Sequence, residues 1–154
     1  MKPVEQRAGL STPVGPVWVE ARDGAITRAG WGAAEAPATP LLSETIAELN
    51  AYFDGRLTRF TVPLRPGVCG LSARVLDAML KIPCGETRTY GDLARDLDAP
   101  AQAIGQACGA NPIPILIPCH RILSSTGLGG YSGAGGIETK VALLKLEGAA
   151  SLLI

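Results

Sequence analysis

Histidine is almost missing from this chain of 154 residues, which contains only His120. The four cysteines, Cys69, Cys84, Cys108 and Cys119, never form a CxxC pair. Structural zinc sites draw about four ligands from these residue types, usually with such close spacing. The sequence therefore predicts no metal site, and nothing else in it calls for a cofactor.

We expect neither a secretory signal nor a membrane-spanning run in this chain. The N-terminal sequence MKPVEQRAGLS has no apolar stretch of the kind that a signal peptide requires. Residues 99–120 carry no charge, but prolines and amide side chains interrupt them, which argues against a transmembrane helix. We expect a cytoplasmic, monomeric protein with reduced cysteines and no membrane partner.

Neither sign of charge is in excess, because 14 basic residues face 14 acidic ones. This balance excludes a histone-like polybasic protein, although a local basic patch is enough to bind nucleic acid. With 47% hydrophobic residues, the chain can bury one domain or two small lobes packed together.

The first 65 residues predict a small α/β lobe. Residues 14–31 have the pattern of a hairpin, with Asp23-Gly24 in its turn. A helix is expected from Ser43, which can serve as its N-cap, to Phe53. Residues 60–64 resemble a short edge strand, because the proline among them cannot donate a ladder hydrogen bond.

Residues 66–154 predict a mostly helical lobe, so the expected fold class is α+β. A helix over residues 72–82 is followed by Thr89 and Asp92, spaced as an acidic variant of the capping box that opens a helix from Tyr90 to Leu97. Pro100 fits the first turn of a further helix that ends near Gly109. Two short helices joined by about three residues are typical of a helix-turn-helix.

The second of these helices has unusually small side chains, including Ala101, Ala103 and Gly105. A smooth helix can approach another macromolecule closely, or it can pack closely inside its own lobe. The pattern alone does not distinguish these two uses.

The sequence NPIPILIPCHRIL places a nucleophile, Cys119, next to a base, His120. A buried cysteine is usually an inert small hydrophobe, but this one follows a proline and adjoins the only histidine. Neighbouring side chains diverge on a helix or a strand, so a direct contact between sulfur and imidazole is disfavoured. We expect a bridging water to carry the proton that must leave for a reactive thiolate to form.

A carboxylate usually orients the other nitrogen of a catalytic imidazole. Glu147 is the candidate, because it ends a helix predicted over residues 137–147, where the helix dipole disfavours a negative charge. The alternative is that Glu147 simply lies at a solvated helix end.

Together these motifs resemble the O6-alkylguanine-DNA alkyltransferases. Pro118-Cys119-His120-Arg121 and the apolar run before it are similar to the active-site signature of that family. Residues 85–94 resemble the segment that leads into its helix-turn-helix, Gly130-Tyr131-Ser132-Gly133 its active-site loop, and residues 140–147 its closing helix. The likeness covers residues 68–148 and extends more loosely over residues 10–65, where it implies a ribonuclease-H-like sheet with a helix.

The resemblance implies a DNA repair protein that binds duplex DNA in the minor groove and flips O6-alkylguanine out of the stack. The alkyl group would pass irreversibly to Cys119, once per molecule. His120 would take the thiol proton through a water, and Glu147 would orient His120. Tyr90 would hydrogen-bond the guanine N3 with support from Lys140.

Further roles follow from the same resemblance. Asn111 would brace the link between recognition helix and active site, the amide of Ser132 would contact O6, and carbonyls near Cys119 and Ile122 would read the exocyclic amine. Pro114 and Gly133 complete the expected substrate-binding set. The expected DNA contacts are Thr89, Tyr90, Ala101, Gln102, Ala103, Gly105 and Arg121.

Gln102 departs from the pattern of the family, which usually has an arginine there that enters the duplex in place of the flipped base. A glutamine brings no charge and less stacking surface, so we predict weaker DNA binding or less efficient flipping with the chemistry intact.

Three other functions compete with this one. A relative that binds alkylated bases without repairing them would have replaced the acceptor cysteine. A helix-turn-helix regulator without chemistry leaves Pro118-Cys119-His120-Arg121 unexplained. A cysteine hydrolase is disfavoured because its nucleophile and base would have to be sequence neighbours.

Overall fold

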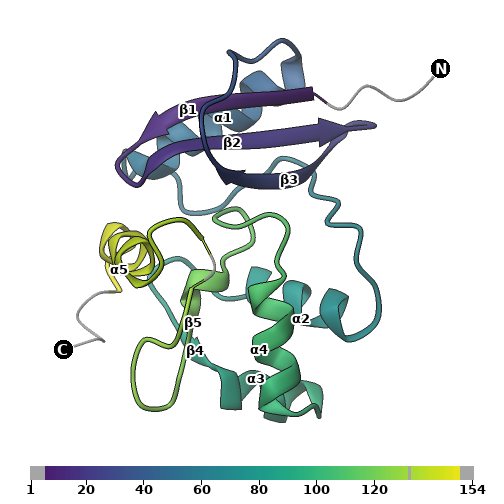
Figure 1. Cartoon of the computed structure of the whole chain (residues 1–154), viewed down its shortest axis with the longest axis vertical. Coiled ribbons are helices and arrows are strands. Elements are labelled where there is room, and N and C mark those ends of the chain that lie inside the picture. Colours follow the sequence, from purple (N-terminus) through teal and green to yellow (C-terminus); the bar gives the residue numbers. More distant parts are fainter. Residues whose placement is uncertain (1–5, 132, 150–154) are drawn as a thin grey trace. The chain divides into compact units, whose positions relative to one another are not determined.

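The computed structural model describes residues 6–131 and 133–149 and divides into two compact units, Met1–Gly67 and Val68–Ile154 (Figure 1). The division falls after Gly67, whereas the sequence placed it after residue 65. Each unit has its own buried residues and is described separately below.

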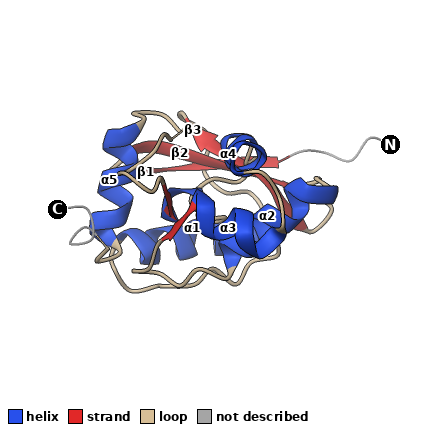
Figure 2. Cartoon of the chain, turned by 90° about the horizontal axis from the view of Figure 1, so that it is seen from below, coloured by secondary structure: helices blue, strands red, loops and turns tan. Residues whose placement is uncertain are grey.

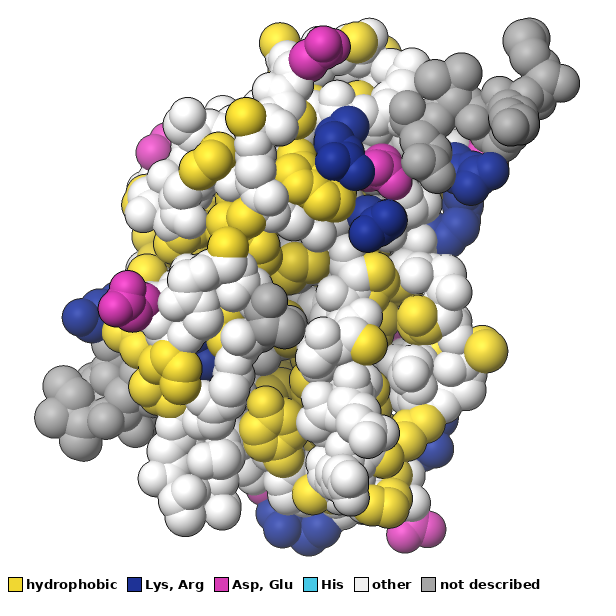
Figure 3. All heavy atoms as spheres, in the orientation of Figure 1, with side chains coloured by type: hydrophobic (Ala, Val, Ile, Leu, Met, Phe, Trp, Pro, Cys, Tyr) yellow, Lys and Arg dark blue, Asp and Glu magenta, His cyan; other side chains and the backbone are white. Residues whose placement is uncertain are grey.

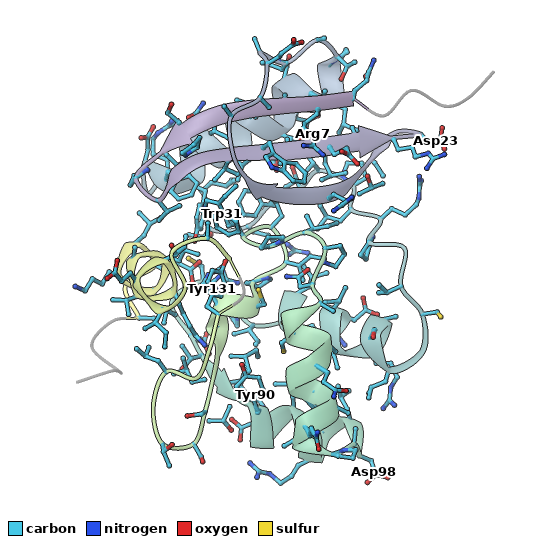
Figure 4. The ribbon with its side chains drawn as sticks, in the orientation of Figure 1. Arg7, Asp23, Trp31, Tyr90, Asp98 and Tyr131 are labelled. Atoms are coloured by element: carbon cyan, nitrogen blue, oxygen red, sulfur yellow. The ribbon has the colours of Figure 1, made fainter. Side chains whose placement is uncertain are left out.

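A three-stranded antiparallel sheet forms the first half of the N-terminal unit. Its strands are β1 (Gln6–Thr12), β2 (Gly15–Arg22) and β3 (Ala25–Trp31), in that order across the sheet. Asp23 and Gly24 both have positive φ, 50° and 80°, as a two-residue hairpin turn requires. The predicted hairpin is confirmed, and Asp23 lies at its tip (Figure 4).

Helix α1 (Pro40–Phe53) contacts β1 and β2. It contributes Leu42, Leu49 and Tyr52 to the buried residues of this unit. Ser43 was wrong as the N-cap, because Thr39 accepts a hydrogen bond from the Leu42 amide at 3.3 Å and the helix begins at Pro40. Proline is favoured at the first position of a helix, because an N–H at that position would have no partner within the helix.

Residues 60–64 were expected to form an edge strand, but the described part of the chain has no strand there. Instead, a single parallel bridge joins Leu64 to Ile26 of β3. The Ile26 amide donates to the Pro63 carbonyl at 2.8 Å, and the Arg65 amide donates to the Ile26 carbonyl at 2.7 Å. One bridge is what remains when a proline removes the ladder donor.

Helices are the main regular elements of the C-terminal unit, and Figure 2 draws them in blue. Helices α2 (Gly70–Leu80), α3 (Tyr90–Leu97) and α4 (Ala101–Gly109) contact one another. The short strands β4 (Arg88–Thr89) and β5 (Ile122–Leu123) form a parallel pair, the 3₁₀ turn η1 (Cys119–Arg121) precedes β5, and α5 (Ile137–Leu146) follows. Across residues 6–131 and 133–149, no helix is long and apolar enough to cross a membrane.

The helix-turn-helix predicted from sequence is present as α3 and α4. Thr89 accepts a hydrogen bond from the Asp92 amide at 3.0 Å, and Asp92 accepts one from the Thr89 amide at 2.9 Å, which confirms the capping box. Asp98 ends α3 in the left-handed conformation, with φ 51°, and lies at the turn between the helices (Figure 4). Helix α4 buries Ile104, Ala107 and Cys108.

Candidate active site

An almost fully buried apolar segment runs from the end of α4 to η1. Ile113, Ile115, Leu116 and Ile117 are each at most 2% exposed. Cys119 opens η1 at the end of this segment and is itself 6% exposed. The apolar run therefore anchors the thiol inside the unit.

Cys119 borders a pocket of about 320 Å³. Figure 4 shows Tyr90 between α4 and the segment that follows β5, and Tyr131 between η1 and α5. Three of the lining residues are glycines, so no side chain projects from the pocket wall at those positions. The lining residues are Tyr90, Gly105, Cys108, Gly109, Cys119, Gly130 and Tyr131.

Behind the thiol, the neighbouring His120 takes part in a buried charged cluster. His120 Nε2 lies 2.7 Å from Glu147 Oε2, and both side chains have no exposed surface. Arg121 donates to the same carboxylate twice, from Nε to Oε1 at 2.9 Å and from Nη2 to Oε2 at 3.0 Å. A third donor of Arg121, Nη1, bonds the Ile82 carbonyl at 2.6 Å.

This cluster explains why an acidic residue is tolerated at the C-terminal end of α5. The bidentate Arg121 compensates both the negative helix terminus and the lost hydration of Glu147. The Glu147 side chain is therefore not at a solvated helix end but faces inward, onto His120.

Burial lowers the pKa of His120, and the hydrogen bond and charge of Glu147 oppose this shift only in part. The imidazole is consequently neutral near pH 7. Because Glu147 already accepts from Arg121, Nε2 is the protonated nitrogen that donates to the carboxylate. Nδ1 is left as an acceptor, and it is a buried atom without a hydrogen-bond partner among the described groups.

Burial raises the pKa of the Cys119 thiol. A hydrogen bond from the Asn111 side chain and the positive charge of Lys140 act in the opposite direction. The resting residue is therefore a thiol that must lose its proton to become a nucleophile. In the described part of the chain, no hydrogen bond joins this thiol directly to His120.

Asn111 connects the end of α4 to the thiol segment. Its Nδ2 donates to the Ile117 carbonyl at 2.9 Å, and its Oδ1 accepts from the Ile113 amide at 3.0 Å. Both contacts are buried, so this side chain fixes the turn that leads to Cys119.

Lys140 is fully buried, and its ammonium donates to the carbonyls of Ile122 at 2.6 Å and Gly130 at 3.1 Å. Burial lowers its pKa to about 8. Burial also raises the pKa of Tyr90, with smaller contributions from Cys108 and Cys119. Lys140 thus ties β5 to the glycine-rich loop beside the pocket.

The other described residues that were expected to bind the substrate do not line this pocket. Ile122 is buried, and its carbonyl already accepts from Lys140. The carbonyls of Pro114 and Gly133 accept from backbone amides two and three residues onward, and neither residue lines the pocket. Ser132 lies outside the described residues.

The residues expected to contact DNA divide into two groups. Ala101 and Gln102 are exposed on α4, Ala103, Gly105 and Thr89 are partly exposed, and Gly105 also lines the pocket. Arg121 contradicts the expectation, because it is only 7% exposed and its guanidinium is held by Glu147 and Ile82. A group that neutralises a buried carboxylate is not available to a phosphate.

Basic side chains near the helix-turn-helix are also largely compensated. Arg88 lies 2.7 Å from Asp96, and Arg95 lies 2.6 Å from Asp92. In the lower part of the face drawn in Figure 3, the dark blue Lys and Arg side chains lie mainly at the margin. Little net positive charge is therefore offered to a DNA backbone.

Three site residues have roles that the sequence did not predict. Cys108 and Tyr131 line the pocket, and Arg121 holds Glu147. The position of Cys108 on the buried face of α4, opposite the exposed Gln102, could have indicated the first. Nothing in the sequence indicates that Arg121 turns inward.

Known proteins match this chain along most of its length. Residues 7–66 match the family described as 6-O-methylguanine DNA methyltransferase, ribonuclease-like domain, and residues 71–149 match the DNA binding domain of the same methyltransferase. A methylated-DNA–protein-cysteine methyltransferase of Mycobacterium leprae is 37% identical over 155 residues, covering 90% of this chain and 89% of the relative.

Solved structures agree with this match. The O6-methylguanine methyltransferase of Mycobacterium tuberculosis superposes with a TM-score of 0.83 at 36% identity, over 96% of this chain and 94% of that one. A structure of the M. tuberculosis OGT in complex with DNA gives a TM-score of 0.83 at 39% identity, over 94% and 93%. This chain belongs to the 6-O-methylguanine DNA methyltransferase family.

Proposed function

We propose that this protein repairs O6-alkylguanine in duplex DNA by transferring the alkyl group to Cys119, in a reaction that each molecule performs once. The observation that carries this proposal is a thiol at the wall of a pocket, followed directly by a buried His120–Glu147–Arg121 cluster.

The cluster supports a proton relay. Glu147 keeps the proton of His120 on Nε2, so Nδ1 is free to accept. A water between Nδ1 and the Cys119 sulfur would then pass the thiol proton to a neutral imidazole. The directions of both pKa shifts fit these roles, because burial keeps the base neutral and the thiol protonated until reaction.

In the transfer step, the Cys119 thiolate attacks the O-alkyl carbon, a carbon–sulfur bond forms, and the carbon–oxygen bond breaks with its electrons moving to the guanine. Donors on the far side would neutralise the leaving purine anion. Tyr90, whose phenol keeps its proton because burial raises its pKa, is suited to donate to the ring. Lys140 would act by holding the loop at Gly130.

A stacked guanine does not expose its O6 substituent, so the base must leave the duplex to enter the pocket. Helix α4 would face the groove with Ala101 and Gln102, its exposed residues near the turn. Small side chains suit a narrow groove. Specificity for alkylated guanine, the monomeric state and a cytoplasmic location stay predictions.

The test is a single incubation with duplex DNA that contains one O6-methylguanine. We expect the intact mass of the protein to increase by one methyl group in place of a hydrogen, while unmodified guanine appears in the DNA. Cys119→Ser should show neither change, and the matched control Cys69→Ser, at an exposed cysteine, should react like wild type. Retention of the modified DNA without a mass change would indicate a binding protein and refute the proposal.

A further inference from the structure

The segment between α4 and η1 contains a strained turn. Ile115 has φ +74°, and the Leu116 amide donates across it to the Pro114 carbonyl at 2.9 Å. A hydrogen bond from residue i+2 to residue i around a positive φ defines the rare form of the γ-turn. For a β-branched residue this conformation is an outlier with a real energetic cost.

Surrounding contacts hold this turn in place. The Ile115 side chain is 1% exposed, and the Ile117 amide closes a wider loop onto the Ile113 carbonyl at 2.9 Å. Asn111 bonds both ends of that loop, at the Ile113 amide and the Ile117 carbonyl. Such over-determination is what allows a strained backbone to persist.

A second tight turn connects the loop to the thiol. Pro118 has φ −83° and ψ 67°, and the Cys119 amide donates to the Ile117 carbonyl at 2.8 Å, which is the inverse γ-turn. The Ile117 carbonyl therefore accepts from both Asn111 and Cys119. The carbonyl of Cys119 is also bonded, by the Ile122 amide, so the backbone on both sides of the thiol is fixed.

We infer that Ile115 is a positioning residue for alkyl transfer: its strained turn, enforced by burial of its side chain, sets the Cys119 thiol against the Asn111 amide and the pocket. The inference rests on the proposed function of Cys119. Relaxation of the turn would move the Ile117 carbonyl, and with it both the thiol and the amide donor that lowers the pKa of that thiol. Sub-ångström placement matters because nucleophilic displacement depends on alignment.

The conformation itself is tested by comparing Ile115→Gly with Ile115→Ala. Both remove the side chain, but only glycine adopts positive φ without strain. We expect the glycine variant to melt a few degrees above the alanine variant, the reverse of the usual order. Ile113→Gly and Ile113→Ala, at an equally buried isoleucine without positive φ, should keep the usual order.

The positioning role is tested with the same variants by single-turnover transfer at saturating O6-methylguanine duplex. We expect Ile115→Ala, whose turn relaxes once the buried side chain no longer enforces positive φ, to transfer at least about tenfold more slowly than wild type, with DNA affinity within about twofold. Ile115→Gly, which keeps positive φ without strain, should be slowed less. The pH profile of transfer should shift upward, because the thiol loses the Asn111 donor. A purely structural role would lower the melting temperature without shifting this profile.

An Ile115→Ala variant that folds, transfers at the wild-type rate and keeps the wild-type pH profile would overturn the inference. Loss of transfer in wild type itself would instead refute the proposed function. If the truncated variants do not fold, Ile115→Val carries the test, since it removes one methyl group from the same contact. It should slow transfer about two- to threefold, and an unchanged rate and profile would overturn the inference.

Discussion

Replacing Glu147 with glutamine tests the proton relay at the residue that sets the tautomer of His120. Glutamine keeps the size of glutamate, but its amide nitrogen can donate to His120 Nε2, which would move the imidazole proton to Nδ1. The nitrogen that should accept the thiol proton would then be a donor. General bases contribute about 10²- to 10⁴-fold to a rate, so we expect a loss of that order in the transfer rate constant.

The cost in stability follows from the same contacts. Glu147 accepts hydrogen bonds at 2.7, 2.9 and 3.0 Å from His120 and Arg121, with no exposed surface on the carboxylate side chain. Breaking a buried ion pair costs about 3–5 kcal/mol. Glutamine still offers Arg121 an acceptor oxygen, so we expect about 3 kcal/mol, the lower end of that range.

The assay is rapid-quench transfer with DNA in excess, measured from acid to alkaline pH alongside thermal unfolding. Burial lowers the pKa of His120 below 6.5, so the wild-type rate should stay level through neutral pH and fall only in more acidic solution. The Glu147→Gln variant should instead gain about tenfold per pH unit, because only free thiolate reacts. Glu138→Gln, at an exposed position of α5, is the matched control and should behave like wild type.

A folded Glu147→Gln variant with a transfer rate within about twofold of wild type and a level neutral profile would refute the relay.

Three further predictions concern other parts of the C-terminal unit. Lys140→Met should lower stability by about 1–3 kcal/mol, because the Ile122 carbonyl loses its buried donor. It should also shift the pH profile of transfer upward, since Lys140 lowers the pKa of Cys119, and an unshifted profile would contradict this electrostatic role. Gln102→Arg should tighten duplex binding at fixed salt and speed repair, and no change in either quantity would contradict the expected weakness of the exposed glutamine. Asp92→Asn should be less stable than wild type at neutral pH. The reason is that hydrogen bonding, chiefly from the Thr89 backbone amide, lowers the pKa of Asp92 in the folded state. The stability from this group is present above the unfolded pKa near 3.8 and is lost as pH falls through the lower folded value, so the difference between the two proteins should vanish in strong acid.

Local signals in the sequence were sufficient where a few adjacent residues decide the structure. Thr89 and Asp92 specify the start of α3 because each satisfies a backbone amide of the other. Asp23-Gly24 specifies the hairpin because both positions need positive φ. Such elements depend little on what packs around them.

Strand β1 could not be found in this way. Its sequence, QRAGLST, buries only Ala8, so it lacks the alternating apolar pattern that marks a strand. Its pairing with β2 supplies the stability that its own residues do not indicate. The same holds for β4 and β5, two-residue strands that pair across more than thirty residues of intervening chain.

At the site, the sequence identified most of the residues but not all of their contacts. The sequence predicted that Cys119, His120 and Glu147 act together. In the structure, Glu147 Oε2 lies 2.7 Å from His120 Nε2. The inward turn of Arg121 and the positive φ of Ile115 were not predictable, because both depend on tertiary contacts that overrule the ordinary preference of the residue. An exposed arginine and an extended isoleucine are what their residue types favour.

The most direct test of the account is to locate the transferred group. Cys108 and Cys119 both line the pocket, but burial raises the pKa of Cys108 to about 12, and only Cys119 adjoins the relay. After reaction with O6-methylguanine duplex, digestion and tandem mass spectrometry should find the methyl group on the peptide that contains Cys119 and no modification of Cys108. A methyl group on Cys108, or on any residue other than Cys119, would contradict the account.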